Sequence, residues 1–224
     1  MAIPKALEPT GIVLVDKPAG PSSFAMVAEV RSRTGAKTGH AGTLDPFATG
    51  LLVLLSGRAT SLQDRFMKLD KRYRTEIDLT ATTTTGDPEG ERRVRHDPLA
   101  GAALAEALET LRGEVELPIP TASAVKIDGE RAYRLHRKGI AVEMPMRVMR
   151  VHSLEVVSQT ADSVTLDLHV GSGTYVRALA EALGGHCSTL RRTEIGPFSV
   201  EAADAERVVP LADALSALAG WIVP

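Results

Sequence analysis

The chain has 224 residues, of which 44% are hydrophobic and 24% charged, and its formal net charge is −2. This composition excludes intrinsic disorder and collagen-like sequence. The single cysteine, Cys187, excludes a disulfide framework. The N-terminal residues lack the pattern of a signal peptide, and the longest apolar run, 51–55, is too short to cross a bilayer. We therefore expect a soluble cytoplasmic protein.

The first third of the chain alternates strand-like and helix-like segments. A Ser-Ser pair at 22–23 can cap a helix that Gly35 would end. The apolar positions of this helix, Phe24, Val27 and Val30, recur every three residues. Polar and apolar residues alternate over 73–79, which is typical of a half-buried strand. We expect strands over 11–15, 51–55 and 73–79, helices over 22–34 and 60–69, and a loop over 37–50.

The rest of the chain continues this mixture. Asp97 is expected to cap a helix in which Leu104, Leu108 and Leu111 form one apolar stripe. Because strands and helices are interspersed without strict βαβ alternation, we predict an α+β fold with a mixed, largely antiparallel central sheet flanked by helices. We expect strands over 148–157, 164–170 and 198–201, helices over 98–111, 132–138, 175–183 and 211–218, and turns over 82–90.

The sequence predicts no metal site and no cysteine nucleophile. None of the usual zinc-ligand spacings occurs, and Cys187 is expected to be a small buried hydrophobe. The segment Gly-Ser-Gly-Thr at 171–174 can cradle a phosphate but lacks the lysine and the spacing of a Walker loop, so we interpret it as a strand-to-helix turn. The histidines are scattered over positions 40, 96, 136, 152, 169 and 186.

The most distinctive local feature is the segment 39–46, Gly-His-Ala-Gly-Thr-Leu-Asp-Pro. Asp45 precedes Pro46, which favours an extended backbone at Asp45. A rigid loop that presents one carboxylate suits a nucleophile or a general base. An Asp-Pro pair is also a common turn starter or helix cap. The residues by themselves leave both interpretations open.

Basic residues gather in two stretches although the net charge is slightly negative. Such stretches are either solvated faces of helices and strands or the footprint of a nucleic acid. The first stretch contains Arg65, Lys68, Lys71, Arg72 and Arg74, and the second contains Lys126, Arg131, Arg134, Arg137, Lys138, Arg147 and Arg150.

Six blocks of the sequence resemble the TruB family of tRNA pseudouridine synthases. Their order and spacing match that family, and the similarity runs from about residue 11 to about residue 200. The GHxGTLDP block is long and specific. The blocks are GIVLVDKPAGPSS from residue 11, GHAGTLDPFATGLL from 39, KRYRTEIDL from 71, PTASAVK from 120, GSGTYVRALAEALG from 171 and LRRT from 190.

The resemblance implies a pseudouridine synthase core, a mixed sheet with a cleft across it. The implied reaction isomerises uridine to pseudouridine at position 55 in the TΨC arm of tRNA. In it the N1–C1′ bond breaks, the uracil turns, and C5 bonds to C1′. The resemblance implies no cofactor and no metal. The implied partner is tRNA. We expect no membrane association, and we expect a monomer.

The resemblance also implies roles for individual residues. Asp45 matches the catalytic aspartate, which either attacks C1′ or assists bond cleavage. Arg177 matches the arginine that pairs with this aspartate and keeps it charged. Tyr73 matches the active-site tyrosine, which can stack on the uracil or transfer a proton. The residues expected to line the substrate site are Lys17, His40, Gly42, Thr43 and Leu190, with His40 in the space that the flipped base vacates.

Members of the family usually carry a C-terminal PUA domain, and the residues after Val200 are too few for one. We therefore expect a catalytic domain over 1–205 and a short tail over 206–224. A noncatalytic RNA-binding or RNA-remodelling protein on the same fold is the alternative function. A third interpretation is a glycoside hydrolase. Such an enzyme needs two acids at the cleft, and the sequence pattern supports only one. The presence of Asp45, Tyr73 and Arg177 favours the synthase.

Overall fold

The computed structural model describes residues 10–94 and 97–221. The extreme N-terminus and His96 lie outside these residues. The chain divides into two compact units. Unit 1 contains the residues up to Arg74 and those from Leu190, and unit 2 contains Thr75–Thr189. Two strands, β4 (Lys71–Asp78) and β12 (His186–Ile195), run from one unit into the other.

The sheet of unit 1 is built around β3 (Thr49–Ser56), which is buried along most of its length. It pairs antiparallel with β1 (Gly11–Lys17) and β2 (Thr38–His40), and parallel with β12. Two short strands complete this sheet, β13 (Phe198–Ser199) on β12 and β14 (Val209–Pro210) on β1.

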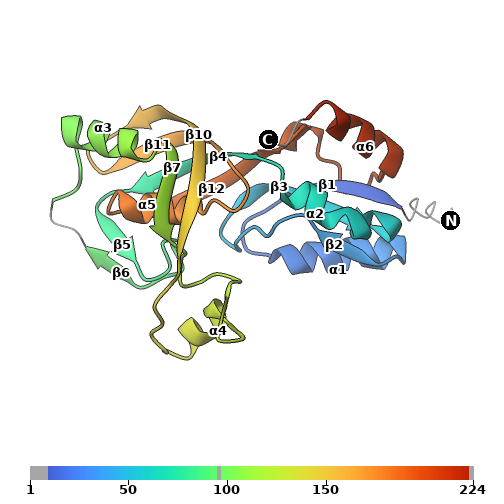
Figure 1. The fold of residues 1–224 in the computed structure, drawn as a ribbon, viewed down its shortest axis with the longest axis horizontal. Helices are drawn as coiled ribbons and strands as arrows, with labels where there is room; N and C mark the ends of the chain where they lie inside the picture. Colours follow the sequence, from blue (N-terminus) through green and yellow to red (C-terminus); the bar gives the residue numbers. More distant parts are fainter. Residues whose placement is uncertain (1–9, 95–96, 222–224) are drawn as a thin grey trace. The chain divides into compact units, whose positions relative to one another are not determined.

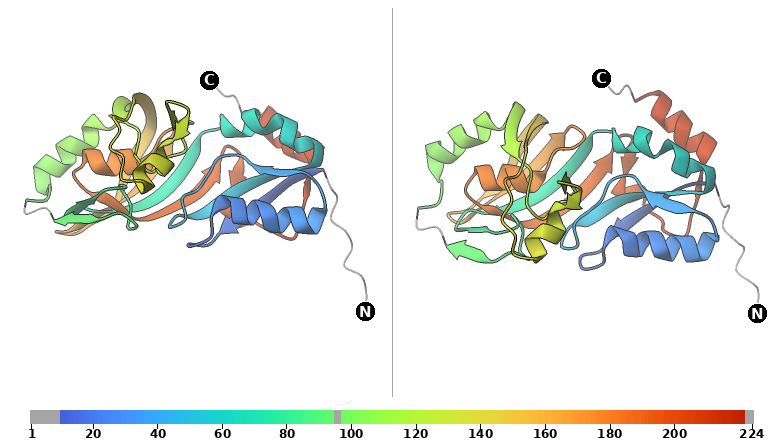
Figure 2. Two further views of the ribbon diagram at one scale, coloured as in Figure 1. Left: turned by 90° about the horizontal axis from the view of Figure 1, so that it is seen from below. Right: turned by 60° about the horizontal axis from the view of Figure 1, so that its bottom comes forward.

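Helices cover both faces of this sheet, which explains why residues 51–55 of β3 form an uninterrupted apolar run. Leu51, Val53 and Leu55 pack in one cluster with residues of η1 (Gly57–Leu62), α2 (Gln63–Met67) and α6 (Leu211–Ala219). Leu52 and Leu54 pack on the other face with α1 (Ser23–Thr34). Figure 2 shows α1 in blue and α6 in red on opposite sides of the strands of unit 1.

The predicted helix after residue 22 is confirmed at both ends. The Ser22 side chain accepts the Ala25 N–H, and Gly35 ends the helix with φ of +65°. Its predicted apolar face is only partly right, because Phe24 is 74% exposed whereas Val27 and Val30 are buried. Two successive steps of three residues rotate the side chain by about 120° around a helix, so Phe24 lies off the face of Val30.

The sheet of unit 2 consists of long antiparallel strands. The longest, β10 (Met146–Gln159), pairs with β11 (Ser163–Val170) on one side and with β7 (Gly113–Pro118) on the other. The predicted alternation along 164–170 is confirmed, since every second residue of β11 is buried. The helices of unit 2 are α3 (Gly101–Thr110), α4 (Ala132–Arg137) and α5 (Val176–Ala182).

Two small hairpins extend from this sheet. They are β5 (Ala81–Thr83) with β6 (Arg92–Val94), and β8 (Lys126–Ile127) with β9 (Glu130–Arg131). In Figure 1 the second hairpin and α4 form a yellow-green segment that is set apart from the main strands of unit 2.

The predicted α+β class with a mixed, largely antiparallel sheet is confirmed, and some local predictions are wrong. Residues 38–40 of the predicted loop form β2, because their backbone pairs with β3. The helix expected after Asp97 begins at Gly101 with Ala100 as its N-cap. Strands β7 and β12 were not predicted. Among the described residues, no helix is long and apolar enough to cross a membrane.

Candidate active site

The Asp45 loop, residues 41–48, joins β2 to β3 within unit 1. Gly42 has φ of +104°, a conformation that glycine adopts readily. Asp45 is half-buried, and its carbonyl accepts the Ala48 N–H at 3.1 Å. The loop therefore turns tightly on both sides of Asp45.

Ser23, in the first turn of α1, holds the middle of this loop. Its buried hydroxyl donates to the Leu44 carbonyl at 2.9 Å and accepts the Leu44 N–H at 2.8 Å. On the other side of Asp45, the Pro46 carbonyl accepts the Gly20 N–H at 2.8 Å. The start of α1 and the segment before it thus fix the backbone around the carboxylate.

Lys17 is a fully buried cation beside the same loop. Its ammonium donates to the carbonyls of Pro18 at 2.8 Å, Pro21 at 2.9 Å and Pro46 at 3.2 Å. Lys17 therefore ties the end of β1 to the residue that follows Asp45. Its contact with the substrate stays a prediction.

Arg192 of β12 is a second buried cation at the loop, and no role was predicted for it from the sequence. Its guanidinium donates to the carbonyls of Leu51 at 2.7 Å and Gly42 at 3.1 Å, and more weakly to that of Thr43 at 3.5 Å. The only signal for Arg192 in the sequence was its place in the LRRT block.

His40 lies at the end of β2, immediately before the loop. Burial and, second, the positive charge of Arg192 lower the pKa of His40 below its ordinary value, so its ring is neutral at pH 7. Its carbonyl accepts the Gln63 side-chain amide at 2.9 Å. The buried Nδ1 atom makes no hydrogen bond within the described part of the chain.

Tyr73 and Leu190, the remaining predicted residues of unit 1, lie on neighbouring strands. Tyr73 is half-buried on β4, and Leu190 is buried on β12. The structure ties Lys17, Gly42 and Thr43 directly to the backbone around Asp45. The contacts of Tyr73, His40 and Leu190 with a uracil stay predictions.

Arg177 belongs to unit 2, where α5 places it in a buried polar network. Its guanidinium donates to the Thr85 carbonyl at 2.6 Å, to the Ala122 carbonyl at 3.0 Å and to Asp87 Oδ2 at 3.3 Å. The side chains of Arg177 and Asp87 are 4% and 5% exposed. The predicted ion pair of Arg177 with Asp45 stays a prediction.

Asp87 is a functional candidate that was not predicted from the sequence. Its Oδ1 atom accepts the Thr85 hydroxyl at 2.6 Å and the Glu89 N–H at 3.0 Å, so the carboxylate that faces Arg177 is held rigidly. The sequence signal for Asp87 is the pair Asp87-Pro88, which repeats the Asp-Pro pair at Asp45. It lies within 82–90, which was predicted only to form turns. A carboxylate in this place orients the guanidinium of Arg177.

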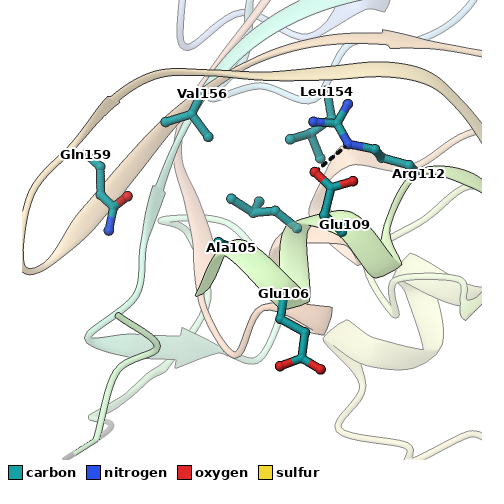
Figure 3. A pocket seen from close by; sticks show the side chains of 8 residues that line it. Ala105, Glu106, Glu109, Arg112, Leu154, Val156 and Gln159 are labelled. Carbon is teal, nitrogen blue, oxygen red and sulfur yellow. Dashed lines mark hydrogen bonds and ion pairs between the residues drawn. The ribbon is translucent and has the colours of Figure 1, made fainter. Parts of the chain in front are cut away.

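One cavity of about 320 Å³ lies elsewhere in unit 2, between α3 and β10 (Figure 3). Its lining contains the exposed ion pair of Arg112 with Glu109, whose atoms are 2.9 Å apart. The apolar part of the lining includes Leu154 and Val156 of β10. None of the residues with a predicted chemical role lines this cavity.

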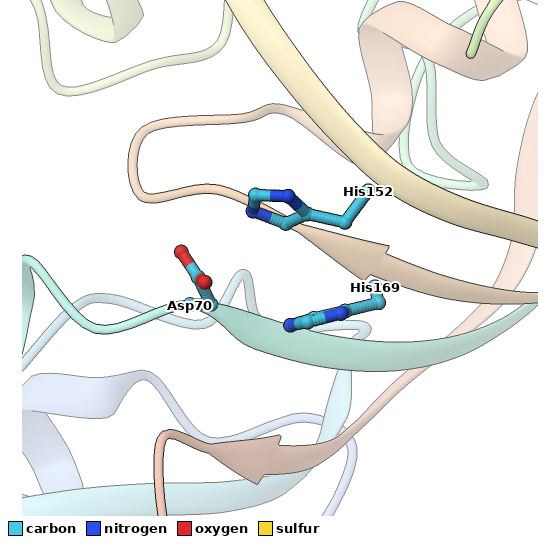
Figure 4. Close-up of side chains that lie close together, drawn as sticks. All are labelled: Asp70, His152 and His169. Carbon is cyan, nitrogen blue, oxygen red and sulfur yellow. The ribbon is translucent and has the colours of Figure 1, made fainter. Parts of the chain in front are cut away.

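Two histidines that are far apart in the sequence meet on the β10–β11 hairpin of unit 2. The rings of His152 and His169 lie 4.7 Å apart between centroids (Figure 4). His152 is at an irregularity in the pairing of the two strands, between Val151 and Ser153, which the spacing of histidines in the sequence does not reveal.

Lys71 was expected in an exposed basic stretch, but it is 7% exposed and donates to the carbonyls of Met67, at 2.5 Å, and Leu69. Burial and, second, the charge of Arg192 lower the pKa of Lys71 to about 8. Between this pKa and the ordinary value of 10.5, the unfolded chain binds more protons than the folded one. The folded protein therefore gains stability as the pH rises through this window.

Urea unfolding of the wild type and Lys71→Met at pH 7 and pH 10 tests this titration. Relative to the variant, the wild type should gain up to about 3 kcal/mol of unfolding free energy at the higher pH. The variant is the matched control, since it keeps every other group that titrates in this range. Equal pH dependence of the two proteins would show that Lys71 titrates normally.

The comparisons with known proteins identify the family. The model of the TruB family pseudouridylate synthase N-terminal domain matches residues 30–176, which is more than half of the chain. The chain belongs to the TruB family. It is similar to tRNA pseudouridine synthase B of Leifsonia xyli subsp. xyli, with 41% identity over 93% of this chain and 77% of the relative. The protein of the same name from Bordetella pertussis is 38% identical over 97% of this chain and 94% of its own length.

Solved structures of other proteins share the fold. A crystal structure of a Cbf5–Nop10–Gar1 complex matches with a TM-score of 0.65 and 27% identity, over 85% of this chain and half of that one. A crystal structure of a pseudouridylate synthase matches with a TM-score of 0.52 and 17% identity, over 93% of this chain and 73% of that one, which shows the fold alone. The resemblance to TruB synthases is confirmed, and this TruB family member is an isomerase that forms pseudouridine from uridine.

Proposed function

We propose that this TruB family member isomerises uridine to pseudouridine at position 55 in the TΨC arm of tRNA, with Asp45 as the nucleophile. Relatives that share about 40% of its residues are named tRNA pseudouridine synthase B. The observation that carries the proposal is the fixed backbone around Asp45, held by Ser23, Lys17 and Arg192. Such fixation suits a carboxylate that must meet one atom of a substrate.

The reaction is an isomerisation, so the substrate gains and loses no atoms overall. It requires an ionised carboxylate. The carboxylate assists cleavage of the N1–C1′ bond, directly at C1′ or by stabilising the charge that develops there. After the uracil turns, C5 bonds to C1′, C5 loses its proton and N1 gains one. We assign Tyr73, on β4, to stacking on the uracil and to this proton transfer.

The target uridine lies within a folded RNA loop and must leave its stack before the reaction. The neutral ring of His40, next to the Asp45 loop, suits stacking in the vacated space and hydrogen bonding through its Nδ1 atom. The guanidinium of Arg177, held by Asp87, suits the orientation of an anionic carboxylate.

The segment around α4 supplies exposed positive charge for the RNA backbone. Arg131, Arg134 and Arg137 are exposed, and the guanidinium of Arg134 lies over the ring of Tyr133 at 5.9 Å. In the first basic stretch Lys71 is buried, so it is excluded from this role, while Arg65, Lys68 and Arg74 are exposed. We assign the exposed residues to phosphate contacts.

The double variant Arg134→Ala with Arg137→Ala should bind tRNA with a weaker salt dependence. Each lost phosphate contact lowers the slope of log affinity against log salt by about 0.7 to 0.9. We therefore expect the slope to fall by about 1 to 2, measured by filter binding over a salt series. Arg112→Ala, outside both stretches, serves as the control. An unchanged slope in the double variant would place the RNA elsewhere.

Release of tritium from tRNA labelled at C5 of its uridines tests the proposed reaction, because C5 loses its proton when it bonds to C1′. One equivalent per tRNA should be released from the unmodified transcript and none from a transcript with cytidine at position 55. Release from both transcripts would refute the proposed position. Release from neither would refute the proposed activity on tRNA.

A further inference from the structure

Arg192 is an unusual group to find inside a protein, since an arginine is seldom fully buried. Its side chain is 1% exposed, and the atoms that receive its N–H groups are carbonyls on the two ends of one segment. Gly42 and Thr43 precede Asp45, whereas Leu51 follows it on β3. One guanidinium therefore spans the entry and the exit of the Asp45 loop.

The backbone of Arg192 is fixed against the same segment. Arg192 pairs in parallel with Gly50. A Cβ atom at Gly50 would lie 2.2 Å from the Arg192 carbonyl oxygen, and Gly50 has φ of +102°. Only glycine permits this close approach without strain. The sheet thus holds the backbone of Arg192 against this segment, and the hydrogen bonds of the guanidinium hold the end of its side chain.

The peptide unit between Thr43 and Leu44 is held from both sides. Arg192 donates to its carbonyl at 3.5 Å, and Ser23 accepts its N–H at 2.8 Å. Because the C=O and N–H of a trans peptide point in opposite directions, two such partners hold the direction of both bonds and oppose a flip of this peptide unit. Asp45 directly follows Leu44, so this peptide unit lies one residue before Asp45.

We propose that Arg192 is a positioning residue for the reaction, which fixes the Asp45 loop through the carbonyls of Gly42, Thr43 and Leu51. The inference rests on the proposed role of Asp45. Lysine cannot replace Arg192, because a single ammonium lacks the planar fork that reaches carbonyls in different directions. The contribution of Arg192 is therefore geometric as well as electrostatic.

Single-turnover kinetics of Arg192→Lys test this proposal, with Arg191→Ala as the matched control. Arg191 is the adjacent residue, and its guanidinium pairs with Asp16 at the surface. We expect Arg192→Lys to react about 10- to 100-fold more slowly at saturating enzyme, with tRNA affinity within about threefold of wild type. Arg191→Ala should keep the wild-type rate. A rate within twofold of wild type in Arg192→Lys would overturn the proposal.

Amide hydrogen exchange separates this proposal from the role of Asp45. In Arg192→Lys the Leu44 N–H should lose protection, while the Leu55 N–H in β3 should keep it. In Arg192→Met, removal of the positive charge should also raise the pKa of His40, followed by NMR, and Arg191→Ala should leave it unchanged. Unchanged exchange at Leu44 would refute the positioning role even if Asp45 proves catalytic. If Asp45→Asn stays active, the proposed function fails while the exchange still reports whether Arg192 holds the loop.

Discussion

Replacement of Asp45 by asparagine is expected to reduce pseudouridine formation to background while tRNA binding survives. The amide keeps the shape of the side chain but cannot act as a nucleophile or carry the negative charge that cleavage of the N1–C1′ bond requires. Loss of a group that acts directly on the reacting atoms costs about 10³-fold or more in rate. Single-turnover conversion of unmodified tRNA measures this loss, and filter binding measures the affinity.

Asp213→Asn is the matched control for this variant, since Asp213 is an exposed aspartate of α6. It should keep the wild-type rate. An Asp45→Asn variant that converts tRNA at the wild-type rate would contradict the assignment of Asp45. A wild-type protein that binds tRNA without converting it would instead support the RNA-binding alternative.

Arg177 is expected to give the second largest effect, on stability as well as on rate. Arg177→Ala leaves the carboxylate of Asp87 buried without its cation, which typically costs about 3–5 kcal/mol of unfolding free energy. Arg177→Lys keeps the charge but cannot donate to Thr85, Asp87 and Ala122 together. We expect the lysine variant to lose rate on the order of 10²-fold.

Urea unfolding and single-turnover kinetics on the same preparations separate the two effects. The exposed pair of Arg112 with Glu109 provides the control, because Arg112→Ala should cost less than about 1 kcal/mol. Asp87→Asn combined with Arg177→Met should destabilise by less than the sum of the single variants, since both buried charges are removed. A fully active Arg177→Lys would mean that Arg177 only balances charge.

The parts of the fold that the sequence predicted are those with clean periodicity. Strand β11 alternates without exception, and residues 51–55 of β3 are all apolar, so local pattern and burial agree. Strand β12 escaped prediction because its buried positions include His186 and Arg192, which a hydrophobic pattern does not count as interior. Strand β7 carries alternating glutamates at the edge of its sheet, which resemble a solvated segment.

The site shows the same division between local and long-range information. The Asp45 loop was found because its residues are contiguous in the chain. Its partners were not, since Ser23 and Leu44 are 21 residues apart and Arg192 and Gly42 are 150 apart. Asp87 and Arg177 are separated by 90 residues, and no short-range pattern joins them. Contacts of this kind depend on which strands pair and in what register, and neither was predicted for β12.

Site-resolved mapping of pseudouridine in one unmodified tRNA tests the proposed position and the proposed role of Asp45 together. Purified wild-type protein and Asp45→Asn are each incubated with the transcript, and every uridine is then examined for conversion. We expect stoichiometric pseudouridine at position 55 with the wild type, no other converted position, and no conversion with the variant. Conversion at another position, or conversion at position 55 by Asp45→Asn, would contradict it.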